Sequence, residues 1–109
     1  MGVPEISVQE AHERLSSPTP PRLIDVREED EWEHCRIEGA ELVPLSHFPT
    51  APLEKLTDRA QPLLIYCHHG SRSAHATDFL LRQGFTDVTN VAGGIHAWSC
   101  EIDPTVPIY

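Results

Sequence analysis

The chain alternates between short runs of consecutive apolar residues and segments whose apolar residues recur with helical spacing. Leu63–Tyr66 is such a run, and Arg22–Arg27 contains another. Consecutive apolar positions are typical of strands buried on both faces of a parallel sheet. The segment Ala74–Gln83 has near-helical spacing instead, and Gly84 follows it as a residue that accepts the positive φ common just past a helix. The pattern predicts buried strands followed by covering helices.

The other segments continue this alternation. We expect further strands at Glu5–Ile6, Glu41–Pro44 and Asp87–Val91, and helices or helical turns at Val8–Leu15, Glu28–His34, Leu53–Arg59 and Gly93–Trp98. Ser7 to Glu10 has the form of a capping box that opens the first helix, and Pro44 is typical of an edge strand. Such alternation predicts one α/β domain over residues 1–109, with a mostly parallel sheet and helices on both faces.

Composition narrows the classes of partner and compartment. The chain has 109 residues, with 17 acidic and 8 basic ones, and a formal net charge of −9. This charge argues against nucleic acid or an anionic membrane as a partner. No apolar stretch approaches the roughly 20 residues that span a bilayer, and the N-terminus lacks the pattern of a signal peptide. Three scattered cysteines indicate neither a disulfide framework nor a zinc knuckle. We therefore expect a soluble, cytoplasmic monomer.

Candidate chemistry is concentrated directly after the run Leu63–Tyr66. Cys67 lies at the predicted carboxyl end of that strand, and the loop that follows leads into the start of a helix. Unpaired amides and the helix dipole at such a position favour negative charge, whether on a thiolate, a persulfide or a bound oxyanion. A buried structural cysteine is the simpler interpretation. The glycine, hydroxyls and arginine in Gly70–Ser73 favour a reactive one.

Several motifs in order resemble those of rhodanese-like, or sulfurtransferase, domains. The segments that carry the resemblance are Leu23–Arg27 with Glu31, Ile37–Ala40, Leu63–Cys67, Gly70–Ser73 and Gly93–Trp98. The resemblance implies a three-layer α/β fold with a five-stranded parallel sheet, and it implies no cofactor. It also implies that Cys67 is catalytic and carries a persulfide, and that a sulfane sulfur is bound by the loop amides of His68, His69, Gly70, Ser71 and Arg72.

The implied reaction is covalent catalysis in two half-reactions. The Cys67 thiolate would take the outer sulfur of thiosulfate or a similar donor and pass it to cyanide, a small thiol or a protein thiol. Two other functions stay open: a non-catalytic interaction or sensing module, and a phosphatase or arsenate reductase. The latter enzymes resemble Cys-x5-Arg, whereas here Arg72 follows after four residues and Ser73 takes the arginine's position. The shorter loop favours sulfur over phosphate.

The side chains of the loop admit more than one role. Arg72 either attracts an anionic donor or forms an ion pair with Asp25 or Glu31, and the sequence leaves both open. His68 and His69 either act on the thiol and donor or project into solvent at the entrance.

Serines, cysteines and the remaining histidines carry weaker expectations. Ser71 and Ser73 either cap the helix or bond to the sulfur donor, and we expect capping. Cys35 and Cys100 are interpreted as bystanders, although Cys35 has the chemistry to resolve a persulfide. His96 is expected on the surface without a role. Cys67, His68, His69 and His75 contain metal-binding atoms, but adjacent residues in a tight loop rarely converge, so we predict no metal site.

Overall fold

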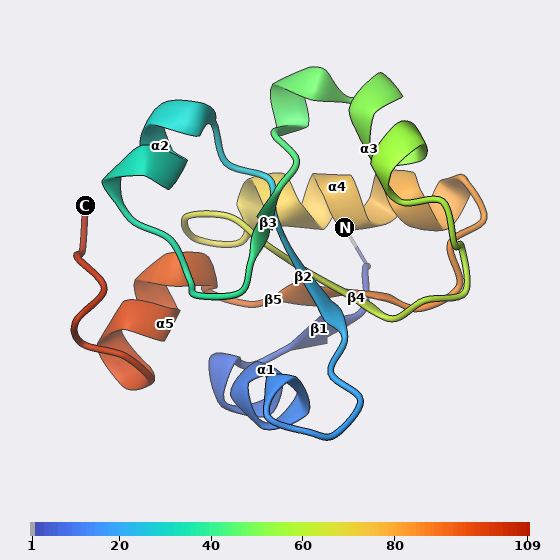
Figure 1. The fold of residues 1–109 in the computed structure, drawn as a ribbon. Coiled ribbons are helices and arrows are strands. Elements are labelled where there is room, and N and C mark those ends of the chain that lie inside the picture. The colour runs from blue at the N-terminus through green and yellow to red at the C-terminus, as the bar shows by residue number, and fades with distance from the viewer. Residues whose placement is uncertain (1) are drawn as a thin grey trace.

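A five-stranded parallel sheet lies between two layers of helices in the computed structural model, which describes residues 2–109 (Figure 1). The sheet order is β1-β5-β4-β2-β3. The strands are β1 (Glu5–Ile6), β2 (Arg22–Asp25), β3 (Glu41–Leu42), β4 (Leu63–Tyr66) and β5 (Val88–Val91). The helices are α1 (Val8–Leu15), α2 (Glu29–His34), α3 (Thr50–Lys55), α4 (Ser71–Arg82) and α5 (Gly94–Glu101), with a 3₁₀ turn η1 at Leu45–His47. The predicted fold class is confirmed.

β4 is the central strand, and its burial on both faces explains its continuous apolar sequence. It pairs in parallel with β2 on one side and with β5 on the other. Leu64 and Tyr66 pack into a hydrophobic cluster with α1 and α5, whereas Leu63 and Ile65 pack into a second cluster with α4. Each face of the sheet therefore has its own core, and Figure 1 shows the helices that lie on the two sides of the sheet.

The first helix begins where the sequence predicts. The side chain of Ser7 accepts a hydrogen bond from the amide of Glu10 at 3.2 Å, and the helix ends at Leu15. In α2 the amide of Glu28 donates to the carboxylate of Glu31 at 3.1 Å. Among residues 2–109, no helix has the length and apolar character needed to cross a membrane.

Several element boundaries differ from the sequence prediction, and those of α3, β2 and β3 have a clear physical reason. α3 spans Thr50–Lys55 rather than Leu53–Arg59, because Leu56 is buried in the core and leaves the helical conformation. β2 ends at Asp25, since the carboxylate of Asp25 accepts the amide of Arg27 in a local turn. β3 ends at Leu42, before Pro44. These turns carry the chain from the carboxyl edge of the sheet into its loops.

Candidate active site

Cys67 directly follows β4 and is 1% exposed. Its Sγ atom accepts a hydrogen bond from the amide of Gly70 at 3.1 Å and another from the hydroxyl of Ser73 at 3.3 Å. Both groups donate toward the sulfur, and donors of this kind stabilise an anionic sulfur over a neutral thiol. The geometry suits a thiolate or a persulfide.

Ser73 therefore has a different place from the predicted one. The N-cap residue of α4 is Gly70, and no side chain makes a capping hydrogen bond there, so the expected capping by Ser71 and Ser73 is wrong. Ser73 is fully buried and lies in the first turn of α4, where its hydroxyl points to Cys67. The signal in the sequence was its position, six residues after Cys67, where the phosphatase pattern has its arginine.

Gly70 allows the loop to curl back over the sulfur. Its φ of +115° is strained for any residue with a side chain. A Cβ atom there would also lie 3.3 Å from the amide nitrogen of Gly93. From β5, the side-chain amide of Asn90 donates to the carbonyl of Gly70 at 3.2 Å and to the carboxylate of Glu5 at 3.0 Å. The loop is thus attached to the neighbouring strand.

The first turn of α5 holds the other end of the loop. The amide of Ile95 donates to the carbonyl of Cys67 at 2.9 Å, and the amide of His96 donates to the carbonyl of His68 at 3.0 Å. Gly94 makes this approach possible, because a Cβ atom there would overlap the carbonyl oxygen of Cys67 and lie 2.6 Å from that of His68. Gly94 therefore allows close packing of α5 against the loop, whereas a Cβ atom at Gly93 would meet Ala97 of α5 itself.

Arg72 forms an ion pair with Glu31, one of the two carboxylates that the sequence left open. Its two terminal nitrogens lie 2.6 and 2.8 Å from the two carboxylate oxygens. The hydrogen bonds from Arg72 are the main cause that lowers the pKa of Glu31 to about 2, against a smaller opposing effect of burial. The pair joins α2 to the start of α4. Contact of Arg72 with a sulfur donor stays a prediction.

Asp25 is paired with Arg27 instead, and both side chains are fully buried. The guanidinium of Arg27 lies 2.7 Å from Asp25 and donates to the carbonyl of Cys35 at 2.6 Å. It also donates to the hydroxyl of Tyr109 at 2.8 Å, and that hydroxyl donates to Glu31 at 2.8 Å. Burial opposes the charge on Arg27, but the bonds with Asp25 and Tyr109 outweigh it and raise its pKa. These polar contacts fix the loops around the sulfur.

Three histidines gather beside the loop, and the sequence predicted no role for one of them, His96. The rings of His68 and His69 have centroids 4.0 Å apart, and the ring of His96 lies 4.8 Å from His69. His96 is half-buried, so its expected place on the surface is wrong. His68 stacks on Tyr109 with centroids 3.9 Å apart. Burial, with a smaller effect of the charge on His69, lowers the pKa of His68, which favours a neutral ring.

The other cysteines lie apart from this site. Cys35, Cys67 and Cys100 are all free thiols. Cys35 belongs to the hydrophobic cluster on the α1 and α5 side of the sheet, whereas Cys67 belongs to the cluster on the other side. The Sγ of Cys35 faces the carbonyl of Pro107 at 3.7 Å. Cys100 is exposed. The contacts of Cys35 agree with its interpretation as a bystander, whereas the Sγ of Cys100 lies 3.9 Å from Nε2 of His96.

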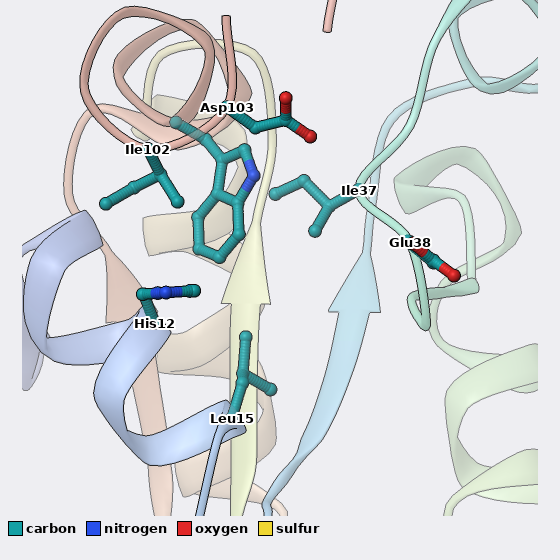
Figure 2. Close-up of a pocket in the computed structure, with 7 residues that line it drawn as sticks. His12, Leu15, Ile37, Glu38, Ile102 and Asp103 are labelled. Carbon is teal, nitrogen blue, oxygen red and sulfur yellow. The ribbon is translucent and has the colours of Figure 1, made fainter. Parts of the chain in front are cut away.

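A pocket of about 410 Å³ lies elsewhere, between α1, α5 and the segment before β3. Leu15, Ile37, Trp98 and Ile102 form its apolar lining, and His12 is among the polar residues at its rim (Figure 2). No residue of the loop from Cys67 to Arg72 lines it. The candidate site is therefore a shallow loop at the end of β4 rather than this cavity.

Known proteins are similar to this chain in sequence and in fold. The model of the rhodanese-like domain matches residues 7–101. The chain is 37% identical to the rhodanese-like/PpiC domain-containing protein 12, chloroplastic, of Arabidopsis thaliana, over 98% of this chain and 38% of that protein. It thus spans less than half the length of this relative.

Two solved structures cover nearly all of the chain. A rhodanese-like domain protein from Staphylococcus aureus has a TM-score of 0.79 and 30% identity, covering 97% of this chain and 98% of that one. The human single-domain sulfurtransferase TSTD1 has a TM-score of 0.79 and 27% identity, covering 92% of this chain and 98% of that one. The family model matches residues 7–101, which is most of this chain, and the sheet order and loop geometry described above agree with that match. This chain therefore belongs to the family of rhodanese-like domains.

Proposed function

We propose that this chain is a sulfurtransferase that moves a sulfane sulfur through a persulfide on Cys67. The observation that carries the proposal is the pair of donors on the buried Sγ, the amide of Gly70 and the hydroxyl of Ser73. A buried structural thiol has no need of two converging donors, whereas an anionic sulfur is stabilised by them. The family supports the same activity, since TSTD1 is a sulfurtransferase.

The first half-reaction loads the enzyme. The Cys67 thiolate attacks the outer sulfur of thiosulfate, a new S–S bond forms to Sγ, and the donor's own S–S bond breaks. Its electron pair leaves with sulfite. No external oxidant is needed, because the transferred sulfur arrives already at the sulfane level. The negative charge that develops along the two sulfurs lies at the start of α4, where the helix dipole and free amides favour it.

The second half-reaction unloads the persulfide. The carbon of cyanide, or the sulfur of a thiolate, attacks the outer sulfur and forms a bond to it. The S–S bond to Cys67 breaks, and its electron pair returns to Sγ as the thiolate. The products are thiocyanate or a new persulfide on the acceptor, and the enzyme is regenerated. A small donor and a small or protein-borne acceptor therefore suffice as partners, without a cofactor.

The loop residues His68, His69, Gly70, Ser71 and Arg72 surround the transferred sulfur in this proposal. Their backbone amides bind the outer sulfur, because the guanidinium of Arg72 is already engaged by Glu31. Arg72 is thus a positioning residue that fixes the loop through α2. The same ion pair disfavours phosphatase chemistry, which needs an arginine free to bind a tetrahedral oxyanion.

The test combines turnover with direct detection of the loaded sulfur. The reduced protein is incubated with thiosulfate, and thiocyanate is measured after addition of cyanide. Intact mass spectrometry before that addition reports a gain of one sulfur atom. We expect Cys67→Ser to abolish both signals, because it removes the nucleophile.

The matched control is Cys100→Ser, which removes an exposed thiol outside the loop and is expected to retain both signals. If neither thiosulfate nor an organic polysulfide adds sulfur to the native protein, the sulfurtransferase proposal is wrong. A non-catalytic interaction or sensing module would then be the favoured function.

A further inference from the structure

Three imidazoles converge beside the Cys67 loop without taking part in the hydrogen bonds that hold its sulfur. His68 and His69 come from the loop, and His96 comes from the first turn of α5. One ring nitrogen of each lies within 4.8 Å of the others. The convergence contradicts the expectation that adjacent residues in a tight loop point apart. The loop curls around the sulfur, and α5 then delivers the third ring.

Two ring nitrogens in this group are buried and have no hydrogen-bond partner. They are Nε2 of His68 and Nδ1 of His96. Buried polar atoms in folded proteins are nearly always paired, and an exception calls for a reason. In the tautomer whose proton is on the other ring nitrogen, such an unpartnered nitrogen has a lone pair available to a metal ion. These orphaned atoms are an observation separate from the convergence of the rings.

A backbone hydrogen bond holds together the two segments that carry His68 and His96. The amide of His96 donates to the carbonyl of His68 at 3.0 Å, so these residues cannot separate without breaking the loop's attachment to α5. The ring of His68 is further fixed by stacking on Tyr109, with an interplanar angle of 6°. Such stacking holds the ring by its face and leaves its edge, which carries the nitrogens, free.

His69 supplies part of the freedom needed to close the site. It is exposed, so its ring can rotate without disturbing the core. Zinc binds imidazole nitrogens at about 2.0–2.1 Å, which in tetrahedral geometry places the nitrogens roughly 3.3–3.4 Å apart. The largest separation in the group is 4.8 Å. The rings of His68 and His96 have the most distant centroids of the group, 6.2 Å apart, so closure to that spacing requires a side-chain rotation at one of these two as well as at His69.

We propose that His68, His69 and His96 form a binding site for a divalent transition-metal ion of the zinc class. Neutral imidazoles are preferred ligands of such borderline ions. The net charge of −9 favours uptake of a cation over loss of one. Three protein ligands leave a fourth position open to water or an anion, beside the loop that holds Cys67.

Cys100 offers a rival arrangement that the test must separate. Its Sγ lies 3.9 Å from Nε2 of His96, one helical turn away on α5. A thiolate and an imidazole at this spacing can also bind zinc. The proposed group contains no cysteine, so the two sites differ in the chemical nature of their ligands.

The experiment uses Zn²⁺ and Co²⁺ alone as probes on the full chain carrying Cys67→Ser. This background removes the reactive thiol, so binding is measured independently of sulfur transfer. We expect one Zn²⁺ per chain by calorimetry and a Co²⁺ spectrum without a thiolate charge-transfer band. His69→Ala and His96→Ala are each expected to weaken binding at least about tenfold, since each removes a ligand. At the same concentration, Zn²⁺ should raise the melting temperature of the parent more than that of His69→Ala.

His47→Ala is the matched control, because His47 is an exposed histidine outside the group, and it should leave the affinity unchanged. Circular dichroism without metal verifies that each variant is folded. Unchanged affinity in the folded His69→Ala variant would overturn the proposal, as would the absence of one-to-one binding. A thiolate band that disappears in Cys100→Ser would overturn it in favour of the rival site.

Discussion

Ser73 has the geometry of a residue that acts on the sulfur of Cys67. Its hydroxyl is fully buried and donates to Sγ, and its carbonyl accepts the hydroxyl of Thr77 at 2.8 Å. A hydroxyl held this way stabilises a thiolate more than it stabilises a thiol. Ser73 therefore adds a second donor to that of the Gly70 amide, and α4 holds it there.

Replacing Ser73 by alanine tests this role. We expect Ser73→Ala to lower kcat/KM for thiosulfate by roughly tenfold, the factor that corresponds to the loss of one hydrogen bond to a charged atom, about 1.5 kcal/mol. The measurement is the thiocyanate assay at several donor concentrations. Ser99→Ala is the control, because Ser99 is also a buried serine but donates to the carbonyl of Val106. Equal activity of the two folded variants would remove Ser73 from the mechanism.

Gly94 is the second residue on which the loop depends. It has φ +57°, and an added Cβ would overlap the carbonyl of Cys67. We expect Gly94→Ala to lower the free energy of unfolding by about 3 kcal/mol, from backbone strain and overpacking together, and to lower sulfur transfer with it.

Gly39→Ala separates these two effects, because Gly39 has φ +86° but no atom lies within 4 Å of its added Cβ. Gly39→Ala should then lower the free energy of unfolding only by the cost of backbone strain, about 1–2 kcal/mol. Urea denaturation of both variants gives the two free energies. A loss no larger in Gly94→Ala than in Gly39→Ala would contradict the account of close packing.

At the level of elements, the ion pair of Glu31 and Arg72 joins α2 to the N-terminus of α4. The pKa of Glu31 is lowered from 4.5 to about 2, so the ionised form is the one that the folded state stabilises. This contribution is complete above pH 4.5 and is lost as the pH falls toward 2. Arg72 is about one-third exposed, so solvent screening reduces the pair to about 1–2 kcal/mol.

Glu31→Gln makes this contribution visible. We expect the variant to be less stable than the native protein by about 1–2 kcal/mol at pH 7 and 5, and the difference to shrink between pH 4.5 and 2. Chemical denaturation at a series of pH values measures it. Asp78→Asn, which breaks an exposed pair with Arg82, should cost less than about 1 kcal/mol at pH 7. A difference for Glu31→Gln that grows toward low pH would contradict the assignment.

The sequence predicts elements well where a local pattern decides them. The buried run Leu63–Tyr66 and the helix start at Ser7 depend on neighbours in the chain, and both are where the pattern placed them. α3 was misplaced because Leu56 turns into the core, which is a tertiary effect. The role of Ser73 arises because the loop curls back on Cys67, six residues earlier. The position of His96 arises from a contact with the distant residue His68. Periodicity is blind to both.

On the scale of the whole molecule, the central sheet separates two hydrophobic clusters. Val8 packs in one cluster, beside the β1 edge, and Val43 packs in the other, just past β3 at the opposite edge. Four strand spacings of about 4.8 Å separate those edges. The two residues share no cluster, so their contributions to stability should be independent.

Val8→Ala and Val43→Ala test this independence. Each is expected to lower the free energy of unfolding by about 1.5–3 kcal/mol, from lost burial and a residual cavity. The double variant should lose the sum of the two within about 0.5 kcal/mol. Urea denaturation of the four proteins measures the coupling. A coupling well above 1 kcal/mol, with two-state unfolding retained, would show that the sheet transmits packing changes between its faces.

The 1% exposure of Cys67 has a consequence for chemical labelling. A bulky electrophile has little access to Sγ itself in the unloaded protein. In the proposed persulfide, the outer sulfur extends beyond Sγ by the length of one S–S bond, about 2.05 Å. The loaded protein therefore presents its nucleophile nearer the surface. A bulky maleimide should thus react faster with loaded than with unloaded molecules. The rate of labelling would then report the fraction of protein molecules that carry the persulfide.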